Sequence, residues 1–445
     1  MSGFDIAVVG GGASGLTAAI EAKRESPGLK VAVIERLSRV GKKLLATGNG
    51  RCNFTNRRLG AEHYQKAADL LPADPVFTRI IDNFNAEAYF RSLGVFGAAD
   101  GEGRVYPLSG SAASVLDGLR LEAGRLGIET FCDLPVERIV PGEAFSLYSR
   151  EKLITAKAVI LAGGGCSQSA LGSDGSVLRL ARSLGLRVSE LSPALVPLKT
   201  DAALVKGLKG VRVGASASLC RGKTPIKTER GEVQFGDNTL SGICIFDLSL
   251  SFVKGVKSVI VLDLLPDRER AEIFAILKSL RKTRANAPSE DLLTGLFHKR
   301  IGLKLLRDCT ERGSTEPASS LSDRELDQIA AEIKYMEFPI LGTAGFEKSQ
   351  VTKGGVIAEE INDSLETKKI PGLYLCGEML DLAGECGGYN LTFAFASGAH
   401  TGRRCAERLS RDILRDPAKR GSGNEKPPLT PPSPKRKKQE RRKNQ

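Results

Sequence analysis

The sequence has no run of eighteen apolar residues, so it predicts no helix that spans a membrane. Met1–Val9 has neither a basic segment before its short apolar run nor a cleavage-type site, so a secretory signal is not predicted. The nine cysteines are scattered without Cys-x-x-Cys spacing, which argues against a zinc site, a disulfide scaffold and a dithiol redox centre. We therefore expect a soluble protein of the reducing cytoplasm.

A strong charge is also lacking once the end of the chain is set aside. The net charge is +13, but Lys419–Gln445 carries ten Lys/Arg and two Glu, a net +8 that leaves +5 for the rest. The body therefore gives little reason to infer nucleic-acid binding. Asp416–Gln445 is rich in Pro, Lys and Arg and almost free of apolar residues, which predicts a disordered tail. The 445 residues are enough for two or three domains.

The stretch Asp5–Glu35 is the most informative part of the chain. Ile6–Val9 predicts a buried strand, GGGASG follows at positions 10–15, and Leu16–Arg24 predicts a helix. The next apolar run ends at Glu35, twenty positions after the last glycine of this motif. A G-x-G-x-x-G turn between a strand and a helix, followed by such an acid, is the fingerprint of a dinucleotide site.

Each part of this motif has a physical task. Gly10 permits the tight turn, Gly12 leaves room for a pyrophosphate, and Gly15 lets the helix pack on the strand. The helix N-terminus offers free N–H groups to phosphates. Glu35 can bind both ribose hydroxyls, and its charge disfavours a 2′-phosphate. The alternative is a glycine-rich turn with Glu35 only solvated.

The polar stretch Arg36–Asn56 follows directly and has no clear apolar period, which in a compact domain is usually functional. Lys42, Lys43 and Arg51 could neutralise phosphates, and Gly48 would let the backbone approach a ring. The alternative is a solvated basic loop.

Regular elements follow along the first half of the chain. We predict helices over Pro75–Leu93, Ser111–Leu126 and Ser176–Leu184, and strands over 127–131, 135–140, 145–149, 153–156 and 158–162. Gly163-Gly164-Gly165 ends the last strand, but no helix begins at once, so a second complete dinucleotide site is not favoured.

The residue pattern between about Ala194 and Pro339 differs from that on either side. It predicts an insertion that is first β-rich and then helical. We predict strands over Val211–Leu219, Glu232–Phe235, Ile243–Leu250 and Ser258–Leu262, then helices over Asp267–Arg284, Ser289–Leu306 and Ser322–Ile333. The basic residues of these helices are expected to be solvated. Beyond the insertion, Gly372–Cys376 predicts a strand, and Gly387-Gly388 precedes a final helix over Leu391–Leu414 whose N-terminus is a second candidate anion or carbonyl site.

Four segments together resemble the BaiN/RdsA-type family of NAD(P)/FAD-dependent oxidoreductases, also labelled aminoacetone-oxidase-like. They are TGNGRCNFTN at 47–56, PALVPL at 193–198, KGGVIAEEI at 353–361 and PGLYLCGEMLDLAGECGGYNL at 371–391, and the resemblance covers Phe4–Leu409. It implies an α/β fold in which a Rossmann-like two-part FAD-binding domain is interrupted by a β-barrel-like domain and a small helical domain. The expected boundaries are 1–193 and 340–415 for the two FAD-binding parts, 194–265 for the β-rich insert, 266–339 for the helical insert and 416–445 for the tail.

The resemblance also implies non-covalent FAD, with NAD(P)H as a possible transient co-substrate. The residues expected to contact FAD come from the glycine turn, the polar stretch after Glu35, two later strand ends and the approach to the last helix. They are Gly10, Gly12, Ala13, Ser14, Gly15, Glu35, Arg36, Lys42, Lys43, Thr47, Gly48, Arg51, Cys52, Asn53, Val136, Ala162, Gly163, Gly377, Glu378, Gly388, Asn390 and Leu391. No metal site is expected.

The sequence departs from this family in two places. Phe235–Ile243 lacks the histidine of the family's Phe-Thr-His-type run, and Asp381–Gly384 lacks a second acid that the family tends to keep. The family therefore gives little guidance on the substrate.

We expect a soluble FAD-dependent oxidoreductase that passes a hydride through flavin N5 between NAD(P)H or a small organic substrate and an organic acceptor or oxygen. Tyr389 is a candidate proton donor and Cys52 a candidate nucleophile, with packing as the alternative role of each. Two other functions stay open: an RNA-modifying flavoprotein that uses the basic tail, and a non-catalytic flavin-binding redox sensor. Nucleic acid is otherwise an unlikely partner on the sequence, and the oligomeric state is not predicted.

Overall fold

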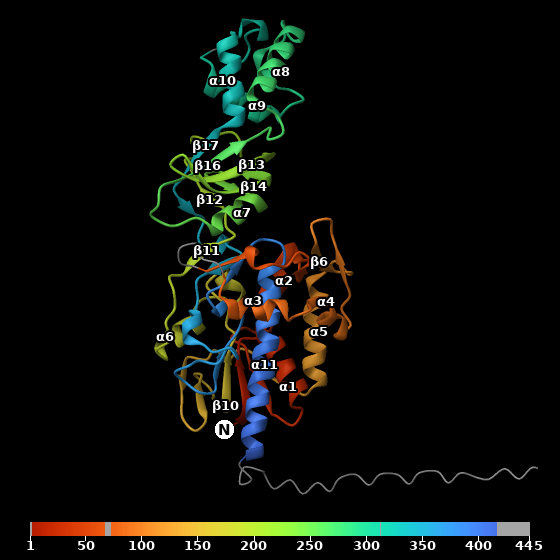
Figure 1. The fold of residues 1–445 in the computed structure, drawn as a ribbon, viewed down its shortest axis with the longest axis vertical. Helices are drawn as coiled ribbons and strands as arrows, with labels where there is room; N and C mark the ends of the chain where they lie inside the picture. Colours follow the sequence, from red (N-terminus) through yellow and green to blue (C-terminus); the bar gives the residue numbers. More distant parts are fainter. Residues whose placement is uncertain (1, 67–72, 312, 416–445) are drawn as a thin grey trace, which may run out of the picture.

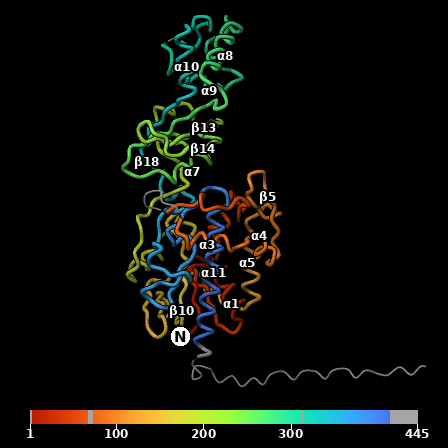
Figure 2. The backbone as a smooth tube through the Cα atoms, viewed as in Figure 1, coloured from red at the N-terminus to blue at the C-terminus, as the bar shows by residue number. Residues whose placement is uncertain are grey.

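The computed structural model describes residues 2–66, 73–311 and 313–415 of the chain. They form an elongated molecule of two lobes (Figure 1). The larger lobe contains both ends of the described chain, and the smaller lobe is built from the middle of the sequence (Figure 2). The predicted disordered tail lies outside the described residues.

A seven-stranded sheet forms the centre of the larger lobe, in the order β7-β2-β1-β10-β9-β8, with β20 also paired to β10. Its strands are β1 (Ser2–Val9), β2 (Val31–Ile34), β7 (Glu129–Phe131), β8 (Arg138–Val140), β9 (Phe145–Tyr148), β10 (Leu153–Leu161) and β20 (Leu373–Leu375). Strands β7, β2, β1, β10 and β20 pair in parallel, as a Rossmann-type sheet requires. β10 is one continuous strand where the sequence predicted two, because its first part pairs with β9 and its second part with β20.

Two helices that are far apart in the sequence pack closely against each other on this sheet. α1 (Ala13–Glu25) follows the glycine turn, and α11 (Tyr389–Arg415) is the last helix (Figure 1). A Cβ atom on Gly398 would lie 2.4 Å from the carbonyl oxygen of Ser14, and one on Gly402 would lie 2.1 Å from that of Ala18. Glycine at these positions therefore brings the N-terminal and C-terminal parts of the lobe together.

Shorter elements complete the larger lobe. They are α2 (Lys42–Ala46), α3 (Pro75–Asp82), α4 (Ala86–Ser92), α5 (Ala112–Arg125), α6 (Ser176–Ser183) and the small strands β3 (Thr55–Asn56), β4 (Tyr64–Gln65), β5 (Gly97–Ala99), β6 (Arg104–Pro107), β11 (Ser192–Ala194), β19 (Val351–Lys353) and β21 (Ala383–Gly384). The single helix predicted over Pro75–Leu93 is wrong. The chain breaks at 83–85, where the side chain of Asn85 accepts a hydrogen bond from Ala88 N and starts α4.

The smaller lobe begins with a second seven-stranded sheet in the order β17-β16-β13-β14-β15-β12-β18. Its strands are β12 (Leu198–Lys199), β13 (Arg212–Arg221), β14 (Thr224–Phe235), β15 (Thr239–Ser241), β16 (Ser258–Asp263), β17 (Met336–Ile340) and β18 (Gly342–Thr343), and every pairing is antiparallel. β17 and β18 are the first and last strands in this order, and only Leu341 separates them along the chain. That connection favours a barrel-like arrangement, which stays a prediction.

Three helices lie at the far end of the smaller lobe (Figure 1): α8 (Arg270–Thr283), α9 (Lys299–Cys309) and α10 (Asp323–Lys334). The long helix predicted over Ser289–Leu306 is wrong, because Ser289–Asp291 forms only a 3₁₀ turn and α9 begins after His298, whose side chain caps it. One hydrophobic cluster joins these helices to the antiparallel sheet. The predicted boundary between a β-rich and a helical domain therefore falls within a shared core, and the domain limits stay predictions.

The strand predicted over Ile243–Leu250 is also wrong, because these residues form the helix α7. A short apolar run does not reveal its period, since a buried strand and a buried helix have the same composition. Gly242, with φ of 111°, turns the chain directly before the helix. α7 faces the larger lobe (Figure 1), so its helical form decides which of its side chains point toward that lobe.

Candidate functional site

A cavity of about 1530 Å³ runs from the glycine turn after β1 to the junction of the two lobes. Its volume exceeds the roughly 300–1,000 Å³ of ordinary ligand pockets. It therefore has room for an extended dinucleotide and a second molecule.

The glycine turn at one end of this cavity has the geometry that its spacing predicts. A Cβ atom on Gly10 would lie 2.4 Å from the carbonyl oxygen of Ala162, and one on Gly15 would lie 1.9 Å from that of Gly10. A Cβ atom on Gly12 would meet nothing within 4 Å. Gly10 and Gly15 thus allow close backbone packing, while Gly12 leaves open space at the N-terminus of α1, where a pyrophosphate would approach.

Glu35 lies at the end of β2 with 8% of its surface exposed, and it lines the cavity. Its Oε2 accepts a hydrogen bond of 2.9 Å from Gly11 N, and its Oε1 accepts one of 2.8 Å from Leu37 N. The carboxylate therefore fixes the glycine turn and keeps lone pairs for a ligand.

The TGNGRCN segment has an unusual backbone along the middle of the cavity. Gly48, Asn49 and Cys52 have φ of 56°, 54° and 58°, and two of these residues are not glycine. Left-handed non-glycine residues cost free energy and cluster at functional sites. Thr47, Gly48 and Asn53 all line the cavity beside this strained backbone.

Asn53 supplies an observation that tests whether a cofactor fits. Its buried Oδ1 atom has no hydrogen-bond partner in the described part of the chain, although the residue lines the cavity. A buried acceptor without a partner is unfavourable. A ligand with an N–H group, such as a flavin ring, would satisfy it, so the residues present fit FAD.

Some of the basic residues predicted to contact FAD already form ion pairs with acidic residues of the protein. Lys43 pairs with Glu378 at 2.8 Å, and Arg36 pairs with Asp174. Arg51 lies over the ring of Tyr106, 4.7 Å from its centroid. The first two cations are therefore already neutralised by the protein.

Nearly all the predicted cofactor residues line this one cavity. They are Gly10, Gly12, Ala13, Ser14, Glu35, Arg36, Lys42, Lys43, Thr47, Gly48, Arg51, Asn53, Val136, Ala162, Gly163, Glu378, Gly388, Asn390 and Leu391. Gly15, Cys52 and Gly377 are not among the lining residues. Gly15 and Gly377 are packing positions, since a Cβ atom on Gly377 would lie 2.4 Å from Ser14 Oγ.

The two candidate catalytic residues are not brought to the cavity. Cys52 is fully buried, and burial raises the pKa of its thiol to about 12. Tyr389 is 5% exposed, its hydroxyl donates to the carbonyl oxygen of Arg58, and burial raises its pKa to about 12. Both side chains have the surroundings of packed groups, and their catalytic roles stay predictions.

Several lining residues were missed at the end of the cavity where the lobes meet. Ile243 and Phe246 come from α7 of the smaller lobe, and Leu195, Glu385 and Cys386 come from the larger one. Ile243 is 53% exposed, which is high for an isoleucine beside a cavity. The apolar run at 243–250 was a signal, but its interpretation as a strand hid which residues share a face.

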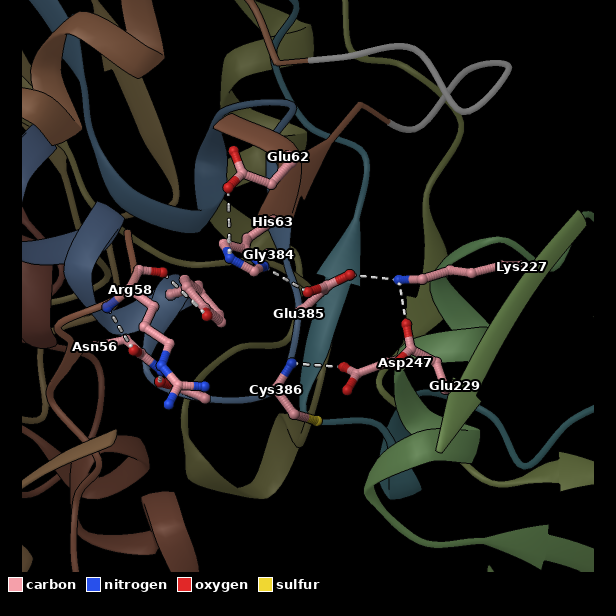
Figure 3. A network of polar contacts seen from close by, with 12 residues as sticks. Asn56, Arg58, Glu62, His63, Lys227, Glu229, Asp247, Gly384, Glu385 and Cys386 are labelled. Carbon is pink, nitrogen blue, oxygen red and sulfur yellow. Dashed lines mark hydrogen bonds and ion pairs between the residues drawn. The ribbon is translucent and has the colours of Figure 1, made fainter. Parts of the chain in front are cut away.

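A polar network connects the two lobes beside this end of the cavity (Figure 3). Glu385 is its centre: Oε2 lies 2.8 Å from His63 Nδ1, and Oε1 accepts a hydrogen bond from Lys227 Nζ of β14. Burial acts to raise the pKa of Glu385, but these two contacts outweigh it and hold the pKa below its ordinary value. Glu385 is therefore a carboxylate that links the lobes at neutral pH.

Asp247 of α7 makes the second polar contact between the lobes (Figure 3). Its Oδ1 accepts a hydrogen bond of 2.6 Å from Cys386 N, directly after Glu385. Burial, the largest cause, and the charge of Glu385 raise the pKa of Asp247 to about 7, although the Cys386 N–H and the charge of Lys227 act to lower it. Asp247 can therefore gain or lose a proton near neutral pH.

Two features are absent from residues 2–66, 73–311 and 313–415. Within them, no helix combines the length and hydrophobicity that crossing a bilayer requires. The same residues contain no cluster of His, Cys, Asp and Glu suited to a metal ion.

Comparison with known proteins gives a family match over nearly the whole chain. Residues 4–404 match the model of the HI0933-like protein Rossmann domain. A 3-dehydro-bile acid delta(4,6)-reductase of Clostridium scindens is 36% identical over 91% of this chain and 99% of that protein. A ribosomal RNA dihydrouridine synthase of Haemophilus influenzae is 27% identical over 91% of this chain and 98% of that protein.

Among solved structures, the fold is similar to that of a 3-ketosteroid-delta4-(5alpha)-dehydrogenase of Rhodococcus jostii. The TM-score is 0.50 at 18% identity, over 91% of this chain and 97% of that one. At this identity the likeness concerns the fold alone. The chain belongs to the HI0933-like Rossmann family, which confirms the resemblance found in its sequence and makes the protein a flavin-dependent oxidoreductase.

Proposed function

We propose that the protein is an FAD-dependent reductase of a carbon–carbon double bond conjugated to a carbonyl group, in a flat and mostly apolar small molecule. The supporting observation is the composition of the cavity. One half is lined by the glycine turn and Glu35, and the other by apolar side chains of both lobes, including Leu195, Ile243 and Phe246. The first half suits a dinucleotide and the second suits an apolar ring system.

The residues present fit the FAD that this function needs. The glycine turn and the N-terminus of α1 would hold the pyrophosphate, Glu35 the adenosine ribose, and Asn53 with Gly388 and Asn390 the flavin end. Bound FAD supplies hydride transfer at N5. The chain itself excludes water with the apolar wall from α7 and fixes the 384–388 loop through Glu385 and Asp247. NAD(P)H is the proposed transient donor.

The names of the two relatives share one chemistry. A delta(4,6)-reductase of a 3-dehydro bile acid reduces double bonds conjugated to a ketone, and a dihydrouridine synthase reduces the uracil double bond next to a carbonyl. Both reactions add a hydride to an electron-poor carbon and a proton to its neighbour. The common element supports the reaction class proposed for this chain.

An RNA substrate is the second candidate, and the name of the Haemophilus influenzae relative favours it. The charges of the smaller lobe give it little support, because many of its basic side chains are paired with acids. The pairs are Arg230–Asp267, Arg270–Asp327, Lys278–Asp323, Arg281–Asp323 and Lys299–Glu290. Phosphate binding needs cations that are free to replace counterions.

The two candidates differ in what reoxidises the flavin. The FAD-loaded protein is reduced anaerobically with NADH or NADPH and then mixed with a 4,6-dien-3-one steroid or with a uridine-containing ribosomal RNA fragment. We expect the steroid to restore the oxidised flavin spectrum and to appear as a reduced product. Reoxidation by the RNA and not by the steroid would replace our proposal with the second candidate, and no bleaching by either nicotinamide would remove NAD(P)H as the donor.

A further inference from the structure

The carboxyl group of Asp247 has an unusual position at the junction of the lobes. It is 8% exposed and belongs to α7, whose residues Ile243 and Phe246 line the cavity. It accepts the N–H of Cys386, which also lines the cavity and is followed by Gly388 and Asn390 on the expected flavin side. The peptide N–H and the thiol of Cys386 therefore connect Asp247 to the wall of the site.

The charged groups around Asp247 come from four segments and do not neutralise it. Lys227 of β14 is within hydrogen-bond distance of both Glu385 and Glu229, so its charge is already shared by two carboxylates. Glu385, from the 384–388 loop, has His63 as its other partner, and His63 ends the 3₁₀ turn Ala61–His63. Lys353 of β19 binds the carbonyl oxygens of Leu250 and Phe252 at the far end of α7. No ion pair of Asp247 occurs in the described ranges of the chain.

We propose that Asp247 takes up a proton when the flavin in the cavity is reduced, and holds it at the junction of the lobes. This inference rests on the FAD of the proposed function and extends it to the proton that accompanies the hydride. Reduction of FAD to its anionic dihydro form takes two electrons and one proton, and Asp247 takes a further proton from solvent. Sodium dithionite or a reduced nicotinamide supplies the electrons.

The direction of the effect follows from electrostatics. A new negative charge beside a buried carboxylate disfavours its ionised form, and the low dielectric of the junction strengthens this repulsion. Burial already brings the pKa of Asp247 to about 7 in the chain itself, so a modest additional charge is enough to change its protonation. A reductase of a conjugated double bond consumes one proton for each hydride, so a proton held here is available to the second half of the reaction.

The test is the number of protons taken up per two electrons, measured with a pH indicator in weakly buffered, FAD-loaded protein between pH 6.5 and pH 8.5 during dithionite reduction. Asp247→Asn keeps an oxygen that can accept from Cys386 N and removes the titration. Asp263→Asn is the matched control, since Asp263 belongs to the same lobe and is paired with Lys334 instead of with the 384–388 loop. We expect the native protein and the control to take up about half a proton more than Asp247→Asn near pH 7.5.

A second measurement uses the native protein alone and does not depend on the variant folding. The redox difference infrared spectrum should gain the band of a protonated carboxylic acid on reduction, with a shift in deuterium oxide. Equal proton uptake by the native protein and Asp247→Asn, or no such band, would overturn the inference while leaving the reductase proposal intact. A chain that binds no flavin would overturn both together.

Discussion

At the scale of single residues, the open space beside Gly12 is the clearest link between sequence and chemistry. Gly12 and Gly28 both have room for a Cβ atom, but only Gly12 lines the cavity. We predict that Gly12→Ala folds normally and weakens FAD binding by about tenfold or more, a loss of ~1.4 kcal/mol, because the methyl group occupies the pyrophosphate approach. Gly28→Ala is the control and should bind FAD as the native protein does. Fluorescence titration of the apoprotein with FAD measures both, and equal affinities would show that no phosphate lies at this turn.

A second residue-scale prediction concerns stability and pH. The pKa of Asp247 is raised in the folded state to about 7, so the folded protein binds this proton more tightly than the unfolded chain does. Stability from this group is therefore present at acid pH and is lost as the pH rises toward 7 and beyond. Between pH 5 and pH 8, the free energy of unfolding of Asp247→Asn should decrease less than that of the native protein, by roughly 1–3 kcal/mol. Urea unfolding at several pH values measures it, and parallel curves for both proteins would refute the assignment.

Residue patterns pointed to the residues that line the cavity near the glycine turn and missed several that line it where the lobes meet. Gly10, Gly12 and Glu35 act through local spacing along one strand–turn–helix unit, which a sequence displays directly. Glu385, Lys227 and Asp247 come together only because the smaller lobe docks on the larger one. No local pattern encodes that contact. The candidate roles of Tyr389 and Cys52 stay predictions, and the burial of both side chains could not be seen from their positions in the sequence.

At the scale of elements, the contact between α1 and α11 connects the two ends of the Rossmann-type lobe. A Cβ atom on Gly402 would lie 2.1 Å from the carbonyl oxygen of Ala18, so Gly402→Ala should separate the helices and cost about 1–3 kcal/mol of stability. Gly124 of α5 is the control, because a Cβ atom there meets nothing within 4 Å. Gly124→Ala should stabilise the protein by roughly 0.5–1 kcal/mol. Thermal unfolding compares them, and equal effects of the two substitutions would contradict the packing described here.

The type of an element could be predicted where a periodic pattern of apolar residues was long. It was predicted wrongly where an apolar run was short. The strict alternation from Val211 to Leu219 gave β13 correctly, and the serine before Ala112 marked the start of α5. The eight residues of α7 are buried on most sides and contain no turn signal, so helix and strand were equally compatible with them. The break between α3 and α4 depends on the cap that Asn85 supplies, which competes with an otherwise continuous helical pattern.

At the scale of the whole molecule, the cavity belongs to both lobes, and the basic tail lies outside the part that the structure describes. We predict that removing residues 416–445 leaves FAD binding and steroid reduction unchanged, because every cavity-lining residue precedes them. Steady-state reduction of the 4,6-dien-3-one measures this. A truncated protein that keeps its flavin but loses all turnover would indicate a partner or substrate bound through the tail, as an RNA-modifying enzyme requires.

We propose that FAD lies extended in the cavity between the glycine turn and the lobe junction. The most direct test of this proposal is the absorption spectrum of the purified protein, followed by titration of the apoprotein with FAD. We predict flavin bands at about one FAD per chain and, as expected for non-covalent binding, release of intact FAD on denaturation. A colourless protein that takes up no added FAD would contradict the account.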